Sequence, residues 1–314
     1  MPAGIITPAD FKKHLHSEVW GSVAQSICNR HGLSSPQLVR SKDGENVIFF
    51  VGENLILKIY GGFRDGFARE KAVLLSVQTA SDTITPEICF EGDVDGWNYL
   101  MMTRLNGKLA KDVWPEVSFG NRIDIATELG LLLKQFHSQA SSTTLPALYQ
   151  DWQGFLRRQF KSCIDRQREN GANPEWLESL PEYMSDRIDL LDSKEKPVLL
   201  HGDIHLGNLM LIQNNGRWQI SGLFDFGDAF HGNVEYDFVA PGVLMIQGNR
   251  ELQRAFLLAY GYEESQLDAE LRAKLMLLTI LYECSNLRKY ALRLAPEAVD
   301  FTLAELEAAI WRFF

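Results

Sequence analysis

The chain contains little cysteine, no long uninterrupted apolar segment and no excess of basic charge. Its four cysteines are scattered over 314 residues without the spacing of metal ligands or of a redox pair, so we expect reduced core residues of a cytosolic protein. The most apolar stretch, 275–282, is too short to span a bilayer. Segment 1–18 lacks the basic stretch and apolar run of a signal peptide. We therefore expect a cytoplasmic protein without a membrane partner.

The charge balance is acidic: 31 Lys and Arg against 41 Asp and Glu give a formal net charge of −10. Sequence-independent nucleic-acid binding depends on Lys and Arg that neutralise phosphates, so this balance argues against a nucleic-acid partner. A cationic or neutral ligand fits better, although solubility alone also explains the charge. With 46% hydrophobic and 23% charged residues, the composition is that of a globular protein with core enough for one large or two smaller domains.

The first third of the chain combines helical and strand patterns. We expect a helical region over 8–31 and a hairpin whose strands are VIFFV (47–51) and LILKIY (55–60). A helix over 68–77 and a strand over 97–102 follow. The chain therefore begins with a small sheet-containing region.

The rest of the chain is mainly helical. Apolar residues recur at helical spacing over 122–137, and everything after Pro241 has a helical pattern. The expected elements are strands 198–200, 209–212 and 218–224 and helices 251–260 and 270–292. We predict an α+β protein with an N-terminal lobe over 1–102, a hinge over 103–107 and a C-terminal lobe over 108–314, and a ligand cleft between the two lobes.

The strongest chemical signal is HGDIHLGN at 201–208, followed by the tripeptide DFG at 225–227. Phosphoryl transfer from ATP needs a carboxylate that orients a hydroxyl and accepts its proton, together with oxygen ligands for Mg²⁺. Asp203 and Asn208 have the spacing of a kinase catalytic loop, H-x-D-x-x-x-x-N, and Asp225 supplies the second metal ligand. A capped turn is the alternative for the loop, but both motifs in this order, separated by a hairpin, favour the kinase interpretation.

Upstream residues fit the same chemistry. Lys58 lies in an apolar strand and Glu70 opens the next helix; such a pair aims an ammonium at the α- and β-phosphates in kinases. The alternatives are a lysine on an edge strand and a glutamate on a solvated helix face. The turn SKDGEN, which ends at Asn46, could cover phosphates with its N–H groups. It lacks G-x-G-x-x-G, so an ordinary hairpin explains it equally well.

The hinge, 103–107, follows the strand WNYLMM and ends at the dipeptide Asn106-Gly107. We expect backbone groups of Thr103 and Leu105 to bind adenine there. The position of this segment between the two lobes favours that contact.

Together these motifs resemble the aminoglycoside phosphotransferase family of the protein-kinase-like superfamily, over about 44–262. The segments that carry the resemblance are HGDIHLGN, with its second histidine His205, and GLFDFGDAFHGNVEYDFV. It implies a bilobal fold, with a small antiparallel-sheet N-lobe and a larger, mainly helical C-lobe. It also implies Asp203 as the catalytic base, with His201 and Asp237 supporting its loop.

The same resemblance implies Mg²⁺ on Asn208 and Asp225, and Lys58 with Glu70 orienting ATP; the choice between ATP and GTP stays open. The segments GENVIFFVGENLILKIYGG, YLMMTRLNG, ELGLLLKQFH and GNRELQRAFLLAYGY are similar to the hygromycin B phosphotransferase branch. Glu45 stands where the family often has a small residue.

The acceptor is expected to be a small cationic molecule, an aminoglycoside, that binds among the C-terminal helices and segment 143–196. Carboxylates there would favour it, although each is also explained as a surface charge. The candidates are Asp228, Glu235, Glu263, Glu264 and Glu283. Glu283 is favoured because its surroundings, LLTILYECSNL, predict an apolar helix.

Three alternatives stay open. A kinase of a metabolite hydroxyl, of the choline, homoserine or hydroxylysine type, would use the same chemistry. A protein kinase is disfavoured because the short segment 225–237 leaves no room for a long activation segment and no A-P-E follows. A binding-only pseudokinase is disfavoured because all five core residues are present. We expect the protein to act as a monomer.

Overall fold

The structure is a computed structural model, and it describes residues 7–42, 44–62, 65–77, 84–139, 145–146, 149–191 and 196–314. The chain forms two compact units. The first unit comprises 1–106 with 221–228, and the second comprises 107–220 with 229–314. The two units are described separately below.

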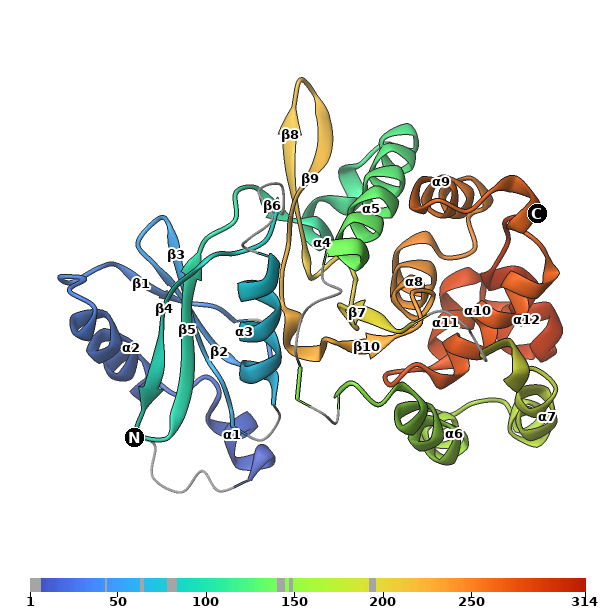
Figure 1. Cartoon of the computed structure of the whole chain (residues 1–314), viewed down its shortest axis with the longest axis horizontal. Coiled ribbons are helices and arrows are strands. Elements are labelled where there is room, and N and C mark those ends of the chain that lie inside the picture. The colour runs from blue at the N-terminus through green and yellow to red at the C-terminus, as the bar shows by residue number, and fades with distance from the viewer. Residues whose placement is uncertain are drawn as a thin grey trace. The chain divides into compact units, whose positions relative to one another are not determined.

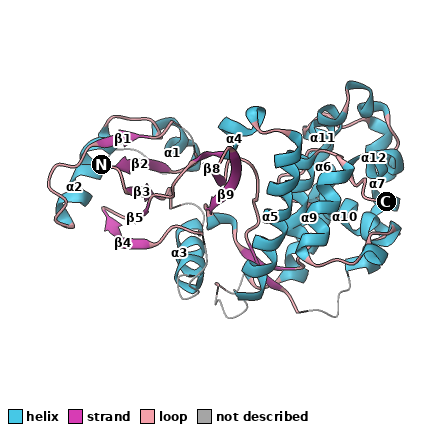
Figure 2. Ribbon diagram, turned by 90° about the horizontal axis from the view of Figure 1, so that it is seen from above, coloured by secondary structure: helices cyan, strands magenta, loops and turns pink. Residues whose placement is uncertain are grey.

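The first unit is built on a five-stranded antiparallel sheet with the strand order β1-β2-β3-β5-β4 (Figures 1 and 2). Its strands are β1 (Leu38–Arg40), β2 (Val47–Val51), β3 (Leu55–Ile59), β4 (Ile88–Val94) and β5 (Trp97–Thr103). Its helices are α1 (Pro8–His14), α2 (Val19–Arg30) and α3 (Gly66–Val77). The predicted hairpin, helix and strand are confirmed; the helical region expected over 8–31 consists of two helices, α1 and α2, and β1 and β4 were not predicted.

The register of this sheet explains where Lys58 lies. Strand β3 pairs with β2 on one side and with β5 on the other, so that Lys58 is opposite Ile48 and Leu100. The apolar side chains of β2 and β3 pack with those of α1 and α2 in one core, which includes Trp20 and Tyr99. The alternative of an exposed lysine on an edge strand is therefore wrong: β3 is a central strand and Lys58 is 4% exposed.

The second unit is mainly helical and contains a few short strands (Figure 2). Its α-helices are α4 (Ala110–Val113), α5 (Phe119–Gln139), α6 (Trp152–Glu169), α7 (Pro174–Ser185), α8 (Tyr236–Pro241), α9 (Arg250–Tyr260), α10 (Ala269–Leu281), α11 (Leu287–Leu294) and α12 (Leu303–Ile310). Its strands are β6 (Lys108–Leu109), β7 (Val198–Leu200), β8 (Leu209–Asn214) and β10 (Phe230–Gly232), and β9 (Arg217–Leu223) continues from this unit into the first. Short 3₁₀ or π turns connect several of them: η1 (Trp114–Glu116), η4 (Ile188–Leu191), η6 (Gly242–Ile246), η7 (Glu264–Gln266) and η8 (Pro296–Asp300).

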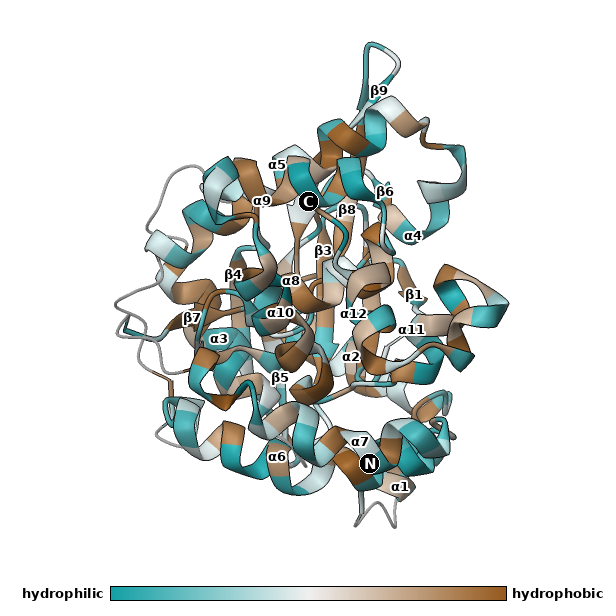
Figure 3. Cartoon of the chain, turned by 90° about the vertical axis from the view of Figure 1, so that its right-hand side faces the viewer, coloured by the Kyte–Doolittle hydropathy of each residue, from teal (hydrophilic) through white to brown (hydrophobic). Residues whose placement is uncertain are grey.

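Helices α5 and α9 pack against each other through a close approach of their backbones. A Cβ atom at Gly130 would lie 2.3 Å from the carbonyl oxygen of Phe256, so only glycine fits at this crossing. Both helices alternate brown and teal segments in Figure 3, as expected for helices with one apolar face. Among the described helices, none combines the length and apolar character that crossing a membrane requires.

Two elements differ from the sequence-based expectation. The helix expected over 270–292 is broken, because α10 ends at Leu281 and α11 begins at Leu287. Asn286 caps α11 by accepting a hydrogen bond from the N–H of Lys289, and the N–H of Leu287 donates to the side chain of Gln167. Segment 221–228, expected in the C-terminal lobe, belongs to the first unit, where Asp225 pairs with Lys58.

Candidate active site

A buried ion cluster lies in the first unit. Strand β3 carries Lys58, and α3 carries Glu70, whose carboxylate lies 2.6 Å from the Lys58 ammonium. Asp225 follows β9 and lies 2.7 Å from the same ammonium. The hydroxyl of Tyr60 also donates to Glu70, at 2.6 Å. The structure thus joins three residues that are separated by up to 167 positions in the sequence.

Electrostatics hold Lys58 in its charged form. Burial alone would lower the pKa of Lys58, but the carboxylates of Asp225 and Glu70 outweigh it and raise the pKa above its ordinary value. Burial raises the pKa of Tyr60, and the neighbouring Glu70 raises it further. Lys58 is therefore cationic, and Tyr60 a neutral donor, at physiological pH.

The DFG segment has a constrained backbone. Asp225 has φ of 68°, in the left-handed region that residues other than glycine seldom adopt. Phe226 next to it is fully buried, whereas the Asp225 side chain is 43% exposed. Such backbone conformations cost about 1–3 kcal/mol and concentrate at functional sites. The fold therefore presents a carboxylate at the surface of the first unit while its neighbour is anchored in the core.

Asp237 of α8 holds the loop that carries Asp203 through hydrogen bonds to the loop's backbone. The two carboxylate oxygens of Asp237 accept hydrogen bonds from the backbone N–H groups of His201, at 2.7 Å, and Gly202, at 2.8 Å. His137 of α5 contacts the same carboxylate at 3.0 Å and, through its other ring nitrogen, the hydroxyl of Tyr260. These buried contacts fix the start of the loop. His201 is completely buried and accepts a hydrogen bond from the N–H of Asp203.

The side chain of Asp203 is about one-third exposed (32%) and is surrounded by hydrogen-bond donors. The hydroxyl of Tyr282 donates to its Oδ1 at 3.0 Å, and His205 Nε2 lies 3.3 Å from its Oδ2. Burial alone would raise the pKa of Asp203, but the contacts with His205, His201 and Tyr282 outweigh it and lower the pKa. Asp203 is therefore an ionised carboxylate at neutral pH.

The loop itself sets the tautomer of His205. The N–H of Gly207 donates to His205 Nδ1 at 2.8 Å, which makes Nδ1 the acceptor and places the proton of the neutral ring on Nε2. That proton then points to the carboxylate of Asp203. The second histidine of the motif is thus a positioning residue for the first carboxylate.

Asn208 is suited to bind a metal ion through its amide oxygen. Its Nδ2 donates to the backbone oxygen of Asp203 at 2.9 Å, which leaves Oδ1 as the atom with ligand character. Amide and carboxylate oxygens are the ligands that Mg²⁺ prefers, so the side chains of Asn208 and Asp225 have the right chemistry. In the described stretches of the chain, no group of three or more His, Cys, Asp or Glu side chains forms a metal site by itself.

The residues predicted to bind nucleotide in the hinge and first turn have other contacts. The N–H of Thr103 donates to the carbonyl of Glu87, the residue that precedes strand β4, at 2.9 Å, and is therefore already engaged. Leu105 packs its side chain against Gly222. Asn46 lies at the end of the turn before β2 and is half-buried; Asp43 of that turn lies outside the described residues.

The predicted acidic acceptor contacts are dispersed. Asp228 belongs to the first unit and pairs with Arg69 at 3.5 Å. Glu235 is buried, forms an ion pair with Lys274 and accepts a hydrogen bond from Tyr262. The remaining three are surface residues: Glu263 caps η7, Glu264 pairs with Arg254, and Glu283 lies exposed in the turn after α10. Glu283 therefore does not lie in an apolar helix, contrary to the expectation.

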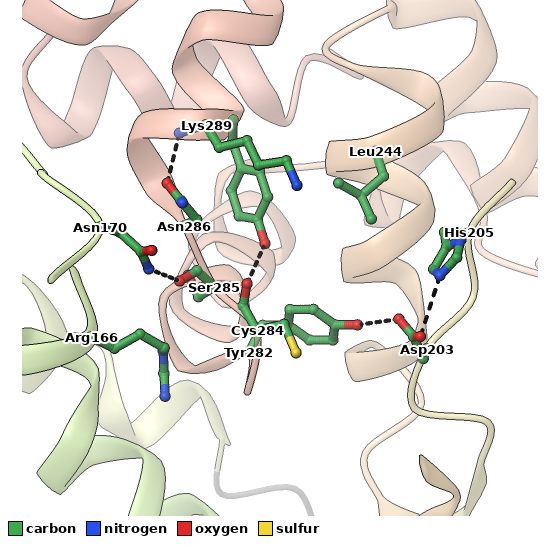
Figure 4. Close-up of a pocket in the computed structure, with 11 residues that line it drawn as sticks. Arg166, Asn170, Asp203, His205, Leu244, Tyr282, Cys284, Ser285, Asn286 and Lys289 are labelled. Carbon is green, nitrogen blue, oxygen red and sulfur yellow. Dashed lines mark hydrogen bonds and ion pairs between the residues drawn. The ribbon is translucent and has the colours of Figure 1, made fainter. Parts of the chain in front are cut away.

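In the second unit, a pocket of about 400 Å³ lies beside the loop of Asp203, and the side chains of Asp203 and His205 form part of its wall (Figure 4). It is lined by Arg166, Asn170, Asp203, His205, Leu244, Tyr282, Cys284, Ser285, Asn286, Lys289 and Tyr290. Sequence reasoning missed most of them, because they come from α6, η6, α11 and the break after α10. No spacing or motif relates them to Asp203. In the sequence, only Asn286, a residue type that favours the start of a helix, indicates that the helical region is interrupted between α10 and α11.

This combination of an antiparallel-sheet unit with a Lys–Glu–Asp cluster and a helical unit with a braced Asp loop defines a kinase-like phosphotransferase fold. A profile of the phosphotransferase enzyme family matches residues 38–275, and the chain belongs to that family. The protein is therefore a phosphotransferase enzyme.

Solved structures share the fold at low sequence identity. Aminoglycoside 2'-phosphotransferase-IIIa in complex with GDP has a TM-score of 0.66 and 18% identity, covering 92% of this chain and 97% of that one. ADP-bound aminoglycoside phosphotransferase APH(2'')-Ib has a TM-score of 0.57 and 18% identity, and the match covers 95% of this chain and 100% of that one. A thermostable mutant of APH(4)-Ia, in a ternary complex with AMP-PNP and hygromycin B, has a TM-score of 0.54 and 17% identity, and the match covers 92% of this chain and 98% of that one. At this level of identity the similarity establishes the fold.

Proposed function

We propose that the protein transfers the γ-phosphate of ATP to a hydroxyl of a small molecule, with Asp203 as the catalytic base. The observation that carries the proposal is the state of Asp203. It is ionised, it lines a pocket, and neighbours from its own loop and from the end of α10 hold it in place: Tyr282, His205 and Asn208. A carboxylate that is positioned but not neutralised by an ion pair with Lys or Arg can accept a proton from a hydroxyl.

The reaction follows from that arrangement. The acceptor hydroxyl attacks the γ-phosphorus in line, its proton passes to Asp203, and the bond between the γ-phosphorus and the oxygen of the departing ADP breaks. Mg²⁺, held by Asn208 and Asp225, would neutralise charge on the phosphate oxygens. Lys58, oriented by Glu70 and Asp225, supplies a fixed positive charge for the α- and β-phosphates. Positioning and electrostatics provide the rate enhancement without a covalent enzyme intermediate.

The nucleotide is proposed on the same grounds. The nucleotides named in the similar structures include GDP, ADP and AMP-PNP, which supports a nucleoside triphosphate as phosphate donor. We propose ATP as the phosphate donor, and GTP is the alternative donor to be tested in the assay. Adenine contact by Leu105 remains a prediction, and Thr103 could contribute only through its carbonyl, because its N–H pairs with Glu87.

An aminoglycoside acceptor, hygromycin B included, is supported by the substrates of the similar structures, whose complexes contain kanamycin, gentamicin or hygromycin B. A metabolite hydroxyl is the second candidate. The charges of the pocket favour a metabolite without net positive charge over an aminoglycoside, because Asp203 is the one carboxylate among the described lining residues.

The test is an ADP-release screen with Mg²⁺ and ATP or GTP. The acceptors are hygromycin B, other aminoglycosides, choline, homoserine and hydroxylysine. We expect turnover that depends on an acceptor and falls about 10²- to 10⁴-fold in Asp203→Asn. An Asp203→Asn variant with near-wild-type turnover would disprove the role of Asp203.

A further inference from the structure

The pocket beside Asp203 carries two positive charges that form no ion pair with a carboxylate in the part of the chain that the structure describes. Arg166 of α6 and Lys289 of α11 both line it. Within the described residues, neither side chain lies within ion-pair distance of an Asp or Glu. The remaining lining residues, apart from Asp203 and His205, are neutral. The pocket is therefore cationic on the side away from the catalytic loop, although the whole chain has a net charge of −10.

Arg166 is held in place but not saturated. Its Nη1 donates to the side-chain oxygen of Gln159 at 2.9 Å, and its Nη2 donates to the carbonyl of Ile280 at 3.4 Å. Its Nε is buried and has no hydrogen-bond partner among the described residues. Arg166 is partly buried, and its acceptors among the described residues are neutral, so a bound anion would stabilise the guanidinium by supplying charge-assisted hydrogen bonds.

The local backbone reinforces the positive potential. Asn286 caps α11 and Lys289 lies in its first turn, and the N-terminal end of a helix carries a partial positive charge. In Figure 4 the Lys289 side chain extends from this helix in the direction of Leu244, while Arg166 approaches from α6. Asn170, Ser285 and Asn286 add polar groups to the same wall. Two independent elements thus place cations around one polar surface.

We propose that the phosphate acceptor is an anionic hydroxyl compound, whose carboxylate or phosphate group is bound by Arg166 and Lys289 while its hydroxyl reaches Asp203. This inference rests on the proposed function and specifies its substrate class. A polycationic acceptor would meet two like charges in this pocket, and Asp203 alone would offset them. A hydroxy acid places its negative charge on the cations and its neutral hydroxyl beside the base.

The first experiment measures acceptor binding by calorimetry, with Mg²⁺ and a non-hydrolysable ATP analogue present. Glycerate and homoserine are each compared with the corresponding primary amide, glycerol 3-phosphate is compared with glycerol, and kanamycin and choline are the cationic probes. We expect at least one compound with a carboxylate or phosphate to bind about tenfold or more tightly than the partner that lacks this anionic group, because the partner loses a charge-assisted pair. A preference for the carboxylate or for the phosphate member identifies the anion. Equal binding of both partners, tighter binding of the cationic probes, or no binding of any anionic member overturns the proposal.

The second experiment assigns the effect to residues. Arg166→Gln and Lys289→Gln should each raise Kd or KM for the anionic acceptor about tenfold, with a smaller change in kcat and an unchanged KM for ATP. Arg168→Gln is the matched control, because Arg168 lies on the same helix, is exposed and pairs with Asp165 outside the pocket. Lys289 is exposed, so its variant keeps the test valid if Arg166→Gln does not fold. An unchanged KM in both pocket variants contradicts the proposal.

The two proposals fail in different ways. Phosphorylation of a cationic acceptor that still requires Asp203 would overturn the anionic acceptor and leave the phosphotransfer function intact. Turnover that survives Asp203→Asn would overturn the catalytic role while leaving anion binding to Arg166 and Lys289 measurable.

Discussion

The two units differ in whether their charged side chains are paired with groups of opposite charge. In the first unit the Lys58 ammonium is buried and contacts two carboxylates, so its charge is neutralised within the protein. In the second unit Asp203 is held by a tyrosine, a histidine and an amide, and the cations Arg166 and Lys289 have no carboxylate partner in the described residues. The first arrangement positions a charge through its partners, whereas the second leaves charges available for a ligand.

In the proposed function, this difference separates residues that would support the chemistry from residues that would select the acceptor. Internal ion pairs depend on excellent geometry, since desolvation offsets much of their attraction. Removing one partner therefore affects folding as well as activity. Side chains whose charge is not yet compensated affect binding more than folding. The predictions below test this contrast.

The largest effect is expected from Asp203→Asn. The substitution removes the base but keeps the volume and most hydrogen-bonding positions, so kcat should fall about 10²- to 10⁴-fold. The KM for ATP and the thermal unfolding midpoint should change little. Steady-state ADP release and a melting curve measure both; a large loss of stability would show that Asp203 is a structural residue instead.

Lys58→Met should come next. It leaves Glu70 and Asp225 as uncompensated negative charges, and breaking a buried pair in this way costs about 3–5 kcal/mol of unfolding free energy. Lys71→Met is the matched control on the more exposed face of α3, where the pair with Glu91 contributes about 1 kcal/mol or less. Urea denaturation of both variants provides the comparison. Equal losses would contradict the buried-cluster description.

Asp237→Ala tests the support beneath the catalytic loop. It leaves the backbone N–H groups of His201 and Gly202 buried without their acceptor, at about 1–3 kcal/mol for each unpaired group. Asp300→Ala, at an exposed position, should be nearly neutral. Urea denaturation and kcat should both report the loss at Asp237. A fully stable and fully active variant would show that the loop needs no such support.

Tyr282→Phe should have the smallest effect. It deletes the donor to Asp203 Oδ1 and to the carbonyl of Gly202 but keeps the ring packing. A hydrogen bond to a charged group contributes about 1.5–3 kcal/mol, so kcat should fall about 10- to 10²-fold. We expect a lower kcat and an unchanged free energy of unfolding, measured by steady-state ADP release and urea denaturation. An effect on acceptor KM alone would place Tyr282 on the substrate side of the pocket.

Sequence reasoning was correct for local elements: the apolar, β-branched runs at 47–51 and 55–60 predicted the hairpin that places Lys58, and Lys58 contacts Glu70 as expected. The roles assigned to HGDIHLGN and DFG from their fixed spacings stay predictions. Sequence reasoning failed where tertiary contacts decide. The break between α10 and α11 depends on Gln167 and on the Asn286 cap, so apolar periodicity predicted one continuous helix and put Glu283 inside it.

The acceptor side was least accessible from the sequence. Overall acidity suggested carboxylates facing a cationic acceptor, but net charge is an average over the whole surface. Arg166 and Lys289 lie far apart in the sequence, and no motif links either of them to the catalytic loop. Their common pocket arises because α6 packs against α10 and bonds through Gln167 to the segment that leads into α11.

The most direct test of the central claim is a phosphorus NMR time course with Mg²⁺, ATP and the best acceptor from the screen. The account predicts that ADP and one phosphate monoester appear in equal amounts, and that the monoester is lost in Asp203→Asn. Release of the γ-phosphate as inorganic phosphate alone, or monoester formation at the wild-type rate in that variant, would contradict it.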